Sequence, residues 1–367
     1  MKNIALKDDN LYYIGGIVRD EILGKECFDI DLTYQGNAIE YCKNLEAQGK
    51  CKILQINEPF GTVKILIDGE ETDIASTRDE IYEKKGHLPT VSNIGCSLKQ
   101  DVLRRDFTIN ALAKSTLTGE IIDYTEGVND IKNKTLRILH DNSFIDDPTR
   151  IVRGLKFSVR FGFELDKHTQ KLQDEYLRNV NYDMSMKRLK KELIETFNLN
   201  SQAAYEKFFA QKIYNLLTKE EVLPPKYNIE NLVNNYPVKN IWLVYIGWMD
   251  LEQLPLTKEE QKIIDDYKIL ISSDIKNDNY EIYKLFEGKS KEAVLLYTVT
   301  TGKDFGLKFF EIADISVSVN GNDLQNLGVP PSKKYTECFD FILKEKLKNP
   351  NITKNDELEL AKTFFGL

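Results

Sequence analysis

The chain is poor in the side chains that build disulfide frameworks and zinc sites. Its 367 residues include five cysteines and three histidines. The cysteines are odd in number and lack paired spacing, and the histidines form no cluster along the sequence. We therefore expect reduced cysteines that serve packing, and histidines in structural or surface positions rather than in catalysis.

The chain also lacks a long apolar run and an excess of positive charge. Its longest apolar stretch, at residues 241–249, is far too short to cross a membrane, and its first residues lack the apolar core of a signal peptide. We therefore expect a cytoplasmic protein without a membrane partner. The formal net charge is −8, from 50 Lys and Arg against 58 Asp and Glu, so a polyanionic partner must meet a local basic surface.

Hydrophobic patterns divide the chain in two. A length of 367 residues exceeds one ordinary core, so two or more domains are expected. The predicted strands all lie before residue 125: 11–14, 27–34, 52–56, 62–67, 71–75 and 121–124. From residue 147 onward apolar residues recur every three or four positions, as in helices. The sequence therefore predicts an α+β protein, with a β-sheet and helices first and an almost entirely helical remainder.

Two aspartates on one predicted strand are the most informative feature. Asp29 and Asp31 lie two positions apart in the strand at residues 27–34, so their carboxylates share a face. Two carboxylates this close repel each other unless a cation lies between them. Such hard oxygen ligands suit Mg²⁺, which could activate an attacking hydroxyl and stabilise the leaving oxygens of a phosphoryl transfer.

A double glycine precedes this strand. Gly15 and Gly16 follow the strand at 11–14 and open a predicted helix at 17–23, whose first turn carries Arg19. Free backbone N–H groups and an open approach at such a helix start can hold a phosphate. Either motif alone is usually a turn or a solvated strand face. Strand, Gly-Gly, helix and two-carboxylate strand in this order are much more specific.

Further charged groups could join this site. Asp73 lies on the second strand of a predicted hairpin and is either a third metal ligand or an exposed hairpin carboxylate. At residues 103–112, a predicted helical face brings Asp106 near Asn110, beside the adjacent guanidiniums of Arg104 and Arg105. Arginine suits phosphate because its planar fork donates two parallel hydrogen bonds.

A second charged series begins at Asp147, which can cap a helix whose first turn holds Pro148. Arg150, Arg153 and Lys156 follow at a spacing of three and share one face of that helix. An amphipathic helix with a solvated charged side is the plain alternative. The series indicates a binding site only when it is taken together with the motifs before it.

Taken in order, these motifs resemble a known family. The segments Gly-Gly-x-Val-Arg-Asp, Asp-x-Asp, Arg-Arg-Asp-Phe-Thr-Ile-Asn-Ala and Asp-Pro-x-Arg-x-x-Arg lie between residues 11 and 163. They look like those of the class II tRNA nucleotidyltransferases, the CCA-adding enzymes and their bacterial poly(A) polymerase relatives. Weaker likeness continues at residues 185–192 and 320–330.

The resemblance implies a domain order and a metal site. The domains would be a nucleotidyltransferase head with a mixed sheet at residues 1–139, a helical neck at 140–200, a helical body at 201–310 and a tRNA-binding helical tail at 311–367. Asp29 and Asp31 would be the catalytic residues and hold Mg²⁺. The implied partners are the acceptor arm and 3′ end of tRNA, with CTP and ATP; no protein partner is evident.

The resemblance also assigns nucleotide and RNA contacts. The implied nucleotide-binding residues are Gly15, Gly16, Arg19, Arg105, Asp147, Arg150, Arg153 and Lys156. RNA would lie along neck cations that include Lys187, Arg188, Lys190 and Lys191, for which a merely soluble helix face is the alternative. Two residues depart from the family pattern: Asp146 replaces a glutamate, and Lys156 replaces the usual arginine and cannot form a bidentate fork.

The chemistry of Asp147 with Arg150 favours two of the four bases. Cytosine and adenine carry an exocyclic amine beside an unprotonated ring nitrogen, so a carboxylate can accept from the amine while a guanidinium donates to the ring. Uracil and guanine present a carbonyl oxygen and a ring N–H instead, and a buried mismatch costs about 1–3 kcal/mol for each unpaired group. The pair therefore predicts selection of CTP and ATP.

The sequence leaves the added bases open, because CCA-adding, A-adding and C-adding enzymes share the head motifs. Residues 78–91 resemble a flexible loop that C-adding members are thought to lack, which favours adenine addition, alone or after two cytosines. A poly(A) polymerase of the same family and a non-catalytic RNA-binding relative are the alternatives. The segment at 320–330 favours tRNA, and the intact Asp29 and Asp31 favour catalysis.

Overall fold

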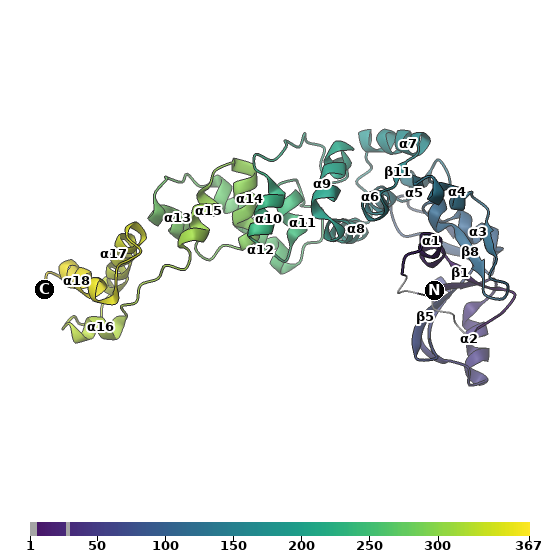
Figure 1. The fold of residues 1–367 in the computed structure, drawn as a ribbon, viewed down its shortest axis with the longest axis horizontal. Coiled ribbons are helices and arrows are strands. Elements are labelled where there is room, and N and C mark those ends of the chain that lie inside the picture. The colour runs from purple at the N-terminus through teal and green to yellow at the C-terminus, as the bar shows by residue number, and fades with distance from the viewer. Residues whose placement is uncertain (1–5, 27–29) are drawn as a thin grey trace. The chain divides into compact units, whose positions relative to one another are not determined.

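Two compact units make up the described chain. The computed structural model describes residues 6–26 and 30–367. The first unit runs to Glu220 and includes Gln253–Pro255, and the second comprises Glu221–Glu252 and Leu256–Leu367 (Figure 1). Every described β-strand belongs to the first unit, which therefore carries the α+β part of the chain.

A mixed sheet forms the N-terminal part of the first unit. Within the described residues it has seven strands in the order β3-β4-β5-β2-β1-β8-β9. They are β1 (Leu11–Ile14), β2 (Asp31–Tyr34), β3 (Lys52–Asn57), β4 (Thr62–Ile67), β5 (Glu70–Ser76), β8 (Leu112–Ser115) and β9 (Ile121–Asp123). β2 and β5 pair in parallel, and the other neighbours are antiparallel. The predicted α+β class is confirmed; of the strand predicted at 27–34, residues 27–29 lie outside the described residues.

Helices and two small strand pairs complete the first unit. The helices are α1 (Gly16–Ile22), α2 (Ala38–Ala47), α3 (Leu98–Leu103), α4 (Gly127–Lys132), α5 (Ser143–Asp146), α6 (Thr149–Phe161), α7 (Lys167–Arg178), α8 (Met186–Leu199) and α9 (Ser201–Ala210). A hairpin joins β6 (Arg78–Ile81) to β7 (Thr90–Ile94), and β10 (Thr135–Leu136) pairs in parallel with β11 (Glu164–Leu165).

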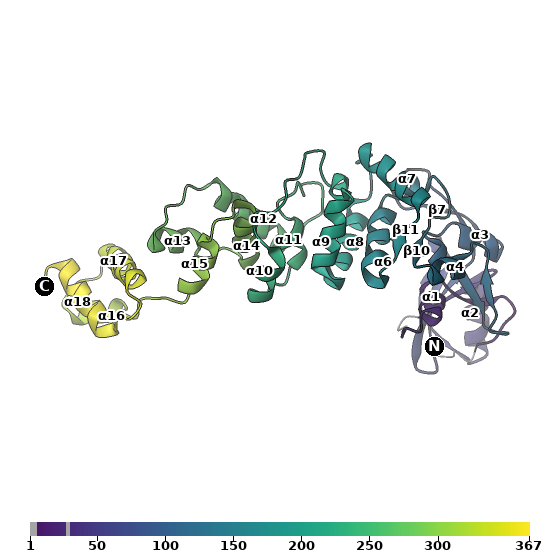
Figure 2. The ribbon, with the colours of Figure 1, turned by 45° about the horizontal axis from the view of Figure 1, so that its top comes forward.

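Apolar periodicity places α6 against α8. Figure 2 shows α6, α8 and α9 side by side. Ile151 and Leu155 of α6, and Leu189 and Leu193 of α8, are at most 3% exposed. Burying a side chain of this size stabilises the fold by about 1.5–3 kcal/mol. The packing of these apolar faces fixes the direction in which the charged face of α6 points.

The predicted helix at residues 103–112 is wrong. Helix α3 ends at the start of this segment, and the 3₁₀ turn η2 (Thr108–Asn110) leads into strand β8. The Asp106 carboxylate accepts from the Phe107 N–H at 2.8 Å, and local side-chain bonds of this kind compete with the backbone bonds of a continuous helix. Strand β8 and the β6–β7 hairpin likewise have no counterpart among the predicted strands.

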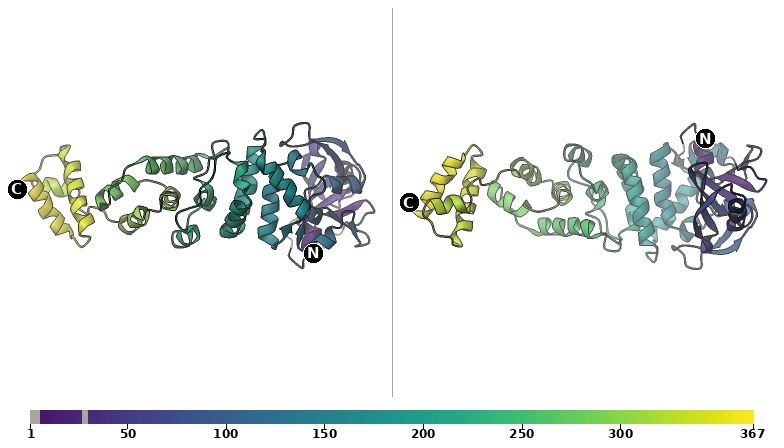
Figure 3. Two further views of the ribbon diagram at one scale, coloured as in Figure 1. Left: turned by 90° about the horizontal axis from the view of Figure 1, so that it is seen from above. Right: turned by 90° about the horizontal axis from the view of Figure 1, so that it is seen from below.

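The regular secondary structure of the second unit, among its described residues, consists of helices. Its helices are α10 (Ile229–Asn235), α11 (Ile241–Ile246), α12 (Lys258–Ser272), α13 (Asn279–Phe286), α14 (Lys291–Thr301), α15 (Phe305–Ile312), α16 (Gly321–Asn326), α17 (Lys334–Lys348) and α18 (Lys354–Phe365). The last three pack around Leu324, Cys338, Ile342 and Ala361, all fully buried (Figure 3, yellow). No helix in residues 6–26 or 30–367 combines the length and apolar character needed to cross a bilayer.

Candidate active site

One pocket in the first unit collects the charged residues of the motifs. It has a volume of about 430 Å³ and lies where the end of β1, the start of β2, the turn around η2 and helix α6 meet. We call it the polar pocket. Its lining residues are Ile14, Gly15, Gly16, Arg19, Asp31, Glu80, Arg104, Arg105, Asp106, Asn110, Asp147, Arg150, Arg153, Lys156, Phe157 and Arg160.

The polar pocket brings together every residue that the sequence assigned to the nucleotide, from Gly15 near the start of the chain to Lys156 in α6. Asp31, one of the expected metal ligands, lines the same pocket. Asp29, the other, lies outside the described residues. Asp73 is not among the lining residues.

Asp73 nevertheless lies beside Asp31. β2 and β5 run parallel with these two residues directly opposite each other, so both side chains share a face on strands about 4.8 Å apart. Lys64, opposite Asp73 on β4, pairs with it at 3.5 Å. Adjacent carboxylates provide the hard oxygen ligands that a divalent cation prefers. The described residues alone contain no group of three or more Asp, Glu, His or Cys side chains that could hold a metal ion.

The backbone at Gly15 makes room for Arg105. Gly15 has a φ of +75°, which disfavours any side chain, and a Cβ there would lie 3.1 Å from Arg105 Nη1. Arg105 Nη2 pairs with Asp101 at 3.1 Å. Its Nε is buried and has no hydrogen-bond partner among the described residues. Because a buried unpaired N–H is costly, this position suits an acceptor supplied by a ligand.

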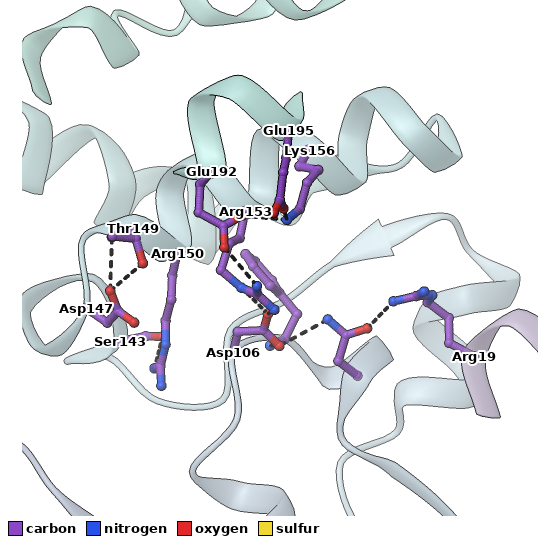
Figure 4. A network of polar contacts seen from close by, with 12 residues as sticks. Arg19, Asp106, Ser143, Asp147, Thr149, Arg150, Arg153, Lys156, Glu192 and Glu195 are labelled. Atoms are coloured by element: carbon purple, nitrogen blue, oxygen red, sulfur yellow. Dashed lines mark hydrogen bonds and ion pairs between the residues drawn. The ribbon is translucent and has the colours of Figure 1, made fainter. Parts of the chain in front are cut away.

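Arg19 is held beside the pocket by several partners and is only 4% exposed. It pairs with Asp20 at 2.7 Å, lies over the ring of Phe161, and donates through Nη1 to Asn110 Oδ1. Asn110 in turn donates to Asp106 Oδ1 at 3.0 Å (Figure 4). The predicted proximity of Asp106 and Asn110 is therefore observed, but a turn rather than a helix produces it.

Buried Asp106 and half-buried Arg153 form an ion pair between this turn and α6 (Figure 4). Arg153 donates to Asp106 Oδ2 from Nε at 2.8 Å and from Nη2 at 2.5 Å. Burial alone would raise the pKa of Asp106. The charge of Arg153, with hydrogen bonds from Asn110, Arg153 and the Phe107 backbone, outweighs burial and holds the pKa well below its ordinary value of 3.8.

Glu192 of α8 bridges two cations of α6. It accepts from Arg153 Nη1 at 3.2 Å and from Lys156 Nζ at 2.5 Å (Figure 4). Glu195, nearly one turn further along α8, also accepts from Lys156, at 2.8 Å. Lys156 thus serves a compact contact with two carboxylates, which a point charge can make without a planar fork.

Asp147 lies immediately before α6 and is 3% exposed. It accepts hydrogen bonds from Thr149 N at 3.1 Å and Thr149 Oγ1 at 2.6 Å (Figure 4). Its second oxygen accepts from Arg188 Nη2 at 2.5 Å. The carboxylate is therefore fixed from two sides while it lines the pocket.

Arg150 is also 3% exposed, and protein acceptors surround its guanidinium. Nη1 donates to Ser143 Oγ at 2.7 Å and lies 3.4 Å from His140 Nε2. Nη2 donates to the Arg104 carbonyl at 2.9 Å and to Tyr82 Oη at 3.3 Å. Tyr82 follows β6, so the hairpin loop contributes to the position of this arginine.

The neck cations differ in what they can contact. Lys187 and Lys191 of α8 are exposed, whereas Arg188 is already paired within the site. Lys190 is 8% exposed and donates to the Pro255 carbonyl at 3.0 Å. The expectation that Lys190 faces RNA is therefore corrected, because its ammonium holds a backbone segment inside the first unit.

Two charged pocket residues were not singled out from the sequence: Glu80 and Arg160. Glu80 accepts from Arg104 Nη1 at 2.8 Å, but it lies on β6, whose pattern predicts no strand. Arg160 reaches Asp20 Oδ2 at 3.3 Å. Because Arg160 follows Lys156 by four positions, extending the charged series along α6 would have found it.

Known proteins share parts of this sequence. Residues 11–137 match the family described as Poly A polymerase head domain. An A-adding tRNA nucleotidyltransferase from Geobacter sulfurreducens is 29% identical, over 96% of this chain and 44% of that protein. An A-adding tRNA nucleotidyltransferase from Halalkalibacterium halodurans is 28% identical, over 97% of this chain and 89% of that protein. The chain thus spans less than half the length of the first relative.

The fold recurs in the structure of the Thermotoga maritima CCA-adding enzyme complexed with tRNA. The TM-score is 0.75 at 23% identity, with 97% of this chain and 90% of that chain covered. The mixed sheet with its polar pocket and the helices that follow therefore have the fold of that protein. Residues 11–137 are thus similar to the Poly A polymerase head domain, and the resemblance to the tRNA nucleotidyltransferases is confirmed.

Asp106→Asn removes the charge that balances Arg153 in a buried position. We expect it to lower the free energy of unfolding by about 1–3 kcal/mol at neutral pH, because Arg153 loses its two hydrogen bonds to a buried carboxylate and keeps only Glu192 as an anionic partner. Since folding lowers the pKa of Asp106, its stabilising effect is present above 3.8 and is lost as the pH falls through the folded value. Denaturant titrations across this range measure both effects.

Asp265→Asn, on the exposed side of α12, is the matched control for this change. Equal stability of Asp106→Asn and Asp265→Asn at neutral pH would contradict the importance of the buried pair.

Proposed function

We propose that this protein transfers AMP from ATP to the 3′ end of tRNA and releases pyrophosphate. The observation that carries the proposal is the polar pocket, in which a base-reading pair, cations for phosphate and a carboxylate of the expected metal site lie together. The two relatives named A-adding tRNA nucleotidyltransferases support the choice of AMP and tRNA.

Asp147 and Arg150 would read the base. The carboxylate would accept from the exocyclic amine of adenine. The guanidinium would donate to the unprotonated ring nitrogen through Nε, because its η nitrogens already have protein acceptors. Both side chains are 3% exposed and fixed by protein partners, so a base with the opposite donor pattern would leave buried groups unpaired. The same two contacts fit cytosine.

The triphosphate would lie at the other end of the pocket. Gly15 and Gly16 leave the approach open, and the unpaired Nε–H of Arg105 offers a donor. Arg19 is already paired with Asp20, so it would form part of the pocket wall and add positive charge near the phosphates. Arg153 and Lys156 of α6 already pair with carboxylates of α8 and of the turn before η2. They would therefore serve mainly to hold α6 in place.

Mg²⁺ is the proposed cofactor, with Asp31 and Asp29 as ligands and Asp73 as the candidate third. The position of Asp31 at the pocket and the register of Asp73 beside it fit a divalent cation with oxygen ligands. When bound, the ion would lower the pKa of the attacking 3′-hydroxyl and polarise the α-phosphate. With the base held at α6 and the outer phosphates near Gly15, the reacting phosphate would lie near Asp31.

The proposal includes the domain order of head (1–139), neck (140–200), body (201–310) and tail (311–367), and a cytoplasmic location. RNA would contact the helical part, starting with the exposed Lys187 and Lys191 of α8. CCA addition is the second candidate function. The pair that reads adenine also accepts cytosine, and the Thermotoga maritima protein of the same fold is a CCA-adding enzyme.

Labelled nucleotides and tRNA transcripts that end before, within or after CCA test the function. We expect Mg²⁺-dependent addition of AMP to a transcript that ends in CC, and little addition to a completed CCA end. Addition of CMP to a transcript that lacks CCA would establish CCA addition instead. A long adenosine tail on any RNA would indicate a poly(A) polymerase, and no incorporation would indicate a non-catalytic relative.

Arg150→Ala tests base reading. Removing the donor to the ring nitrogen should reduce the preference for ATP over GTP by about tenfold to a hundredfold, the equivalent of one unpaired buried group. Steady-state incorporation of each nucleotide measures the preference. Arg178→Ala, at an exposed position of α7, is the matched control. An unchanged preference in Arg150→Ala would exclude the arginine from base recognition.

Asp31→Asn separates chemistry from binding. We expect transfer to slow by about a thousandfold, because metal stabilisation of the transition state is worth several kcal/mol, while ATP affinity without RNA changes little. Asp73→Asn is the informative companion, and its loss should be smaller because Lys64 already pairs with Asp73. Parent-like transfer by Asp31→Asn would overturn the metal assignment, and parent-like transfer by Asp73→Asn would exclude Asp73 as a ligand.

A further inference from the structure

His140 contacts the arginine that would read the base, although the sequence patterns predict no histidine in the site. Its Nε2 lies 3.4 Å from Arg150 Nη1, and its Nδ1 lies 4.0 Å from Asp146 Oδ2. His140 belongs to the turn that precedes α5, and its half-buried ring lies between Asp146 of α5 and Arg150 of α6. It therefore faces a carboxylate on one side and a guanidinium on the other.

We propose that neutral His140 is a positioning residue that holds Arg150 in its base-reading orientation, and that protonation of the ring releases this hold. The inference rests on the proposed function, because it concerns how Arg150 meets the base. It adds a proton-dependent control of nucleotide affinity to that function.

The hydrogen-bond inventory of Arg150 supports this role. Its two η nitrogens carry four N–H groups, and four acceptors surround them: Ser143 Oγ, His140 Nε2, the Arg104 carbonyl and Tyr82 Oη. Only the imidazole changes its accepting ability near neutral pH. A neutral ring with its proton on Nδ1, toward Asp146, offers a lone pair to Arg150. A protonated ring donates from both nitrogens and adds a positive charge beside the guanidinium.

The charges around His140 set the direction of its titration. Burial lowers the pKa of His140 below its ordinary 6.5, as do the charges of Arg150 and Lys85, while Asp146 and Asp141 oppose them. Both carboxylates have other cationic or histidine partners. Lys85, from the hairpin loop, pairs with Asp146, and Asp141 accepts from His168 Nε2 at 2.8 Å. The ring is therefore neutral at neutral pH and becomes charged only in acid.

ATP affinity tests the proposal without any chemistry. Calorimetric titrations use the full chain with ATP and Mg²⁺, without RNA, at about pH 7.5 and about pH 5. We expect the parent to lose about tenfold in affinity in acid, the effect of one unit of pKa coupling. His140→Gln keeps an acceptor that cannot be protonated, so its loss should stay below about twofold. His140→Ala should bind more weakly at both values, and His140→Gln should restore binding.

His168→Gln is the matched control, since His168 is an exposed histidine of α7 that pairs with Asp141 and does not reach Arg150. It should lose affinity in acid as the parent does, and the titration of ATP itself affects all variants alike. An equal acid loss in His140→Gln and the parent would overturn the proposal. So would a parent whose affinity does not change with pH.

A measurement on the parent chain covers the case in which His140→Gln does not fold. Because linkage is reciprocal, ATP should lower the pKa of His140, as read from the NMR shift of its ring with and without nucleotide. An unchanged pKa would contradict the coupling. ATP affinity that does not change with pH would contradict this inference but not the proposed function. Absence of tRNA labelling, together with an ATP-induced drop in the pKa of His140, would contradict the proposed function but not this inference.

Discussion

The buried contact between Asp106 and Arg153 is the constraint on which the site depends. It joins the turn that enters the sheet to the middle of α6, across 47 positions of sequence. Because the buried carboxylate of Asp106 would lose its cationic partner without Arg153, the pair favours one placement of α6 against the turn. Arg150 lies one turn earlier on the same helix, so this placement also sets the distance between the base-reading end of the pocket and the glycines at β1.

Several cations of the pocket pair with carboxylates, whereas the acceptors around Arg150 are neutral groups. Asp20 pairs with Arg19, and Asp101 pairs with Arg105. The chain as a whole carries a formal charge of −8, yet charges beyond about 8–10 Å are largely screened at ordinary salt. A nucleotide in the pocket therefore meets nearby cations rather than the acidic total. Cations already fixed by the protein also lose less side-chain freedom when a ligand binds.

Regular local patterns made much of the fold predictable. Alternation identified the β4–β5 hairpin, and the spacing of three and four identified α6 with its charged face. The prediction failed at residues 103–112, where polar side chains bind the backbone locally, and at the β6–β7 hairpin, whose charged strands lack a clear apolar alternation. Lys190 was misjudged as a surface cation because burial depends on what packs against a helix rather than on the helix alone.

The sequence by itself determined the residue types of the site and their order: paired glycines, alternate aspartates, and a cationic series on one helix. These patterns follow from the periods of a strand, two residues, and of a helix, 3.6 residues, which relate residues close together in the chain. Only the tertiary structure decided that Asp73 lies opposite Asp31, that His140 reaches Arg150, and that the hairpin loop contacts the same arginine. Such contacts depend on strand order and helix packing, which bring together segments that local spacing cannot relate.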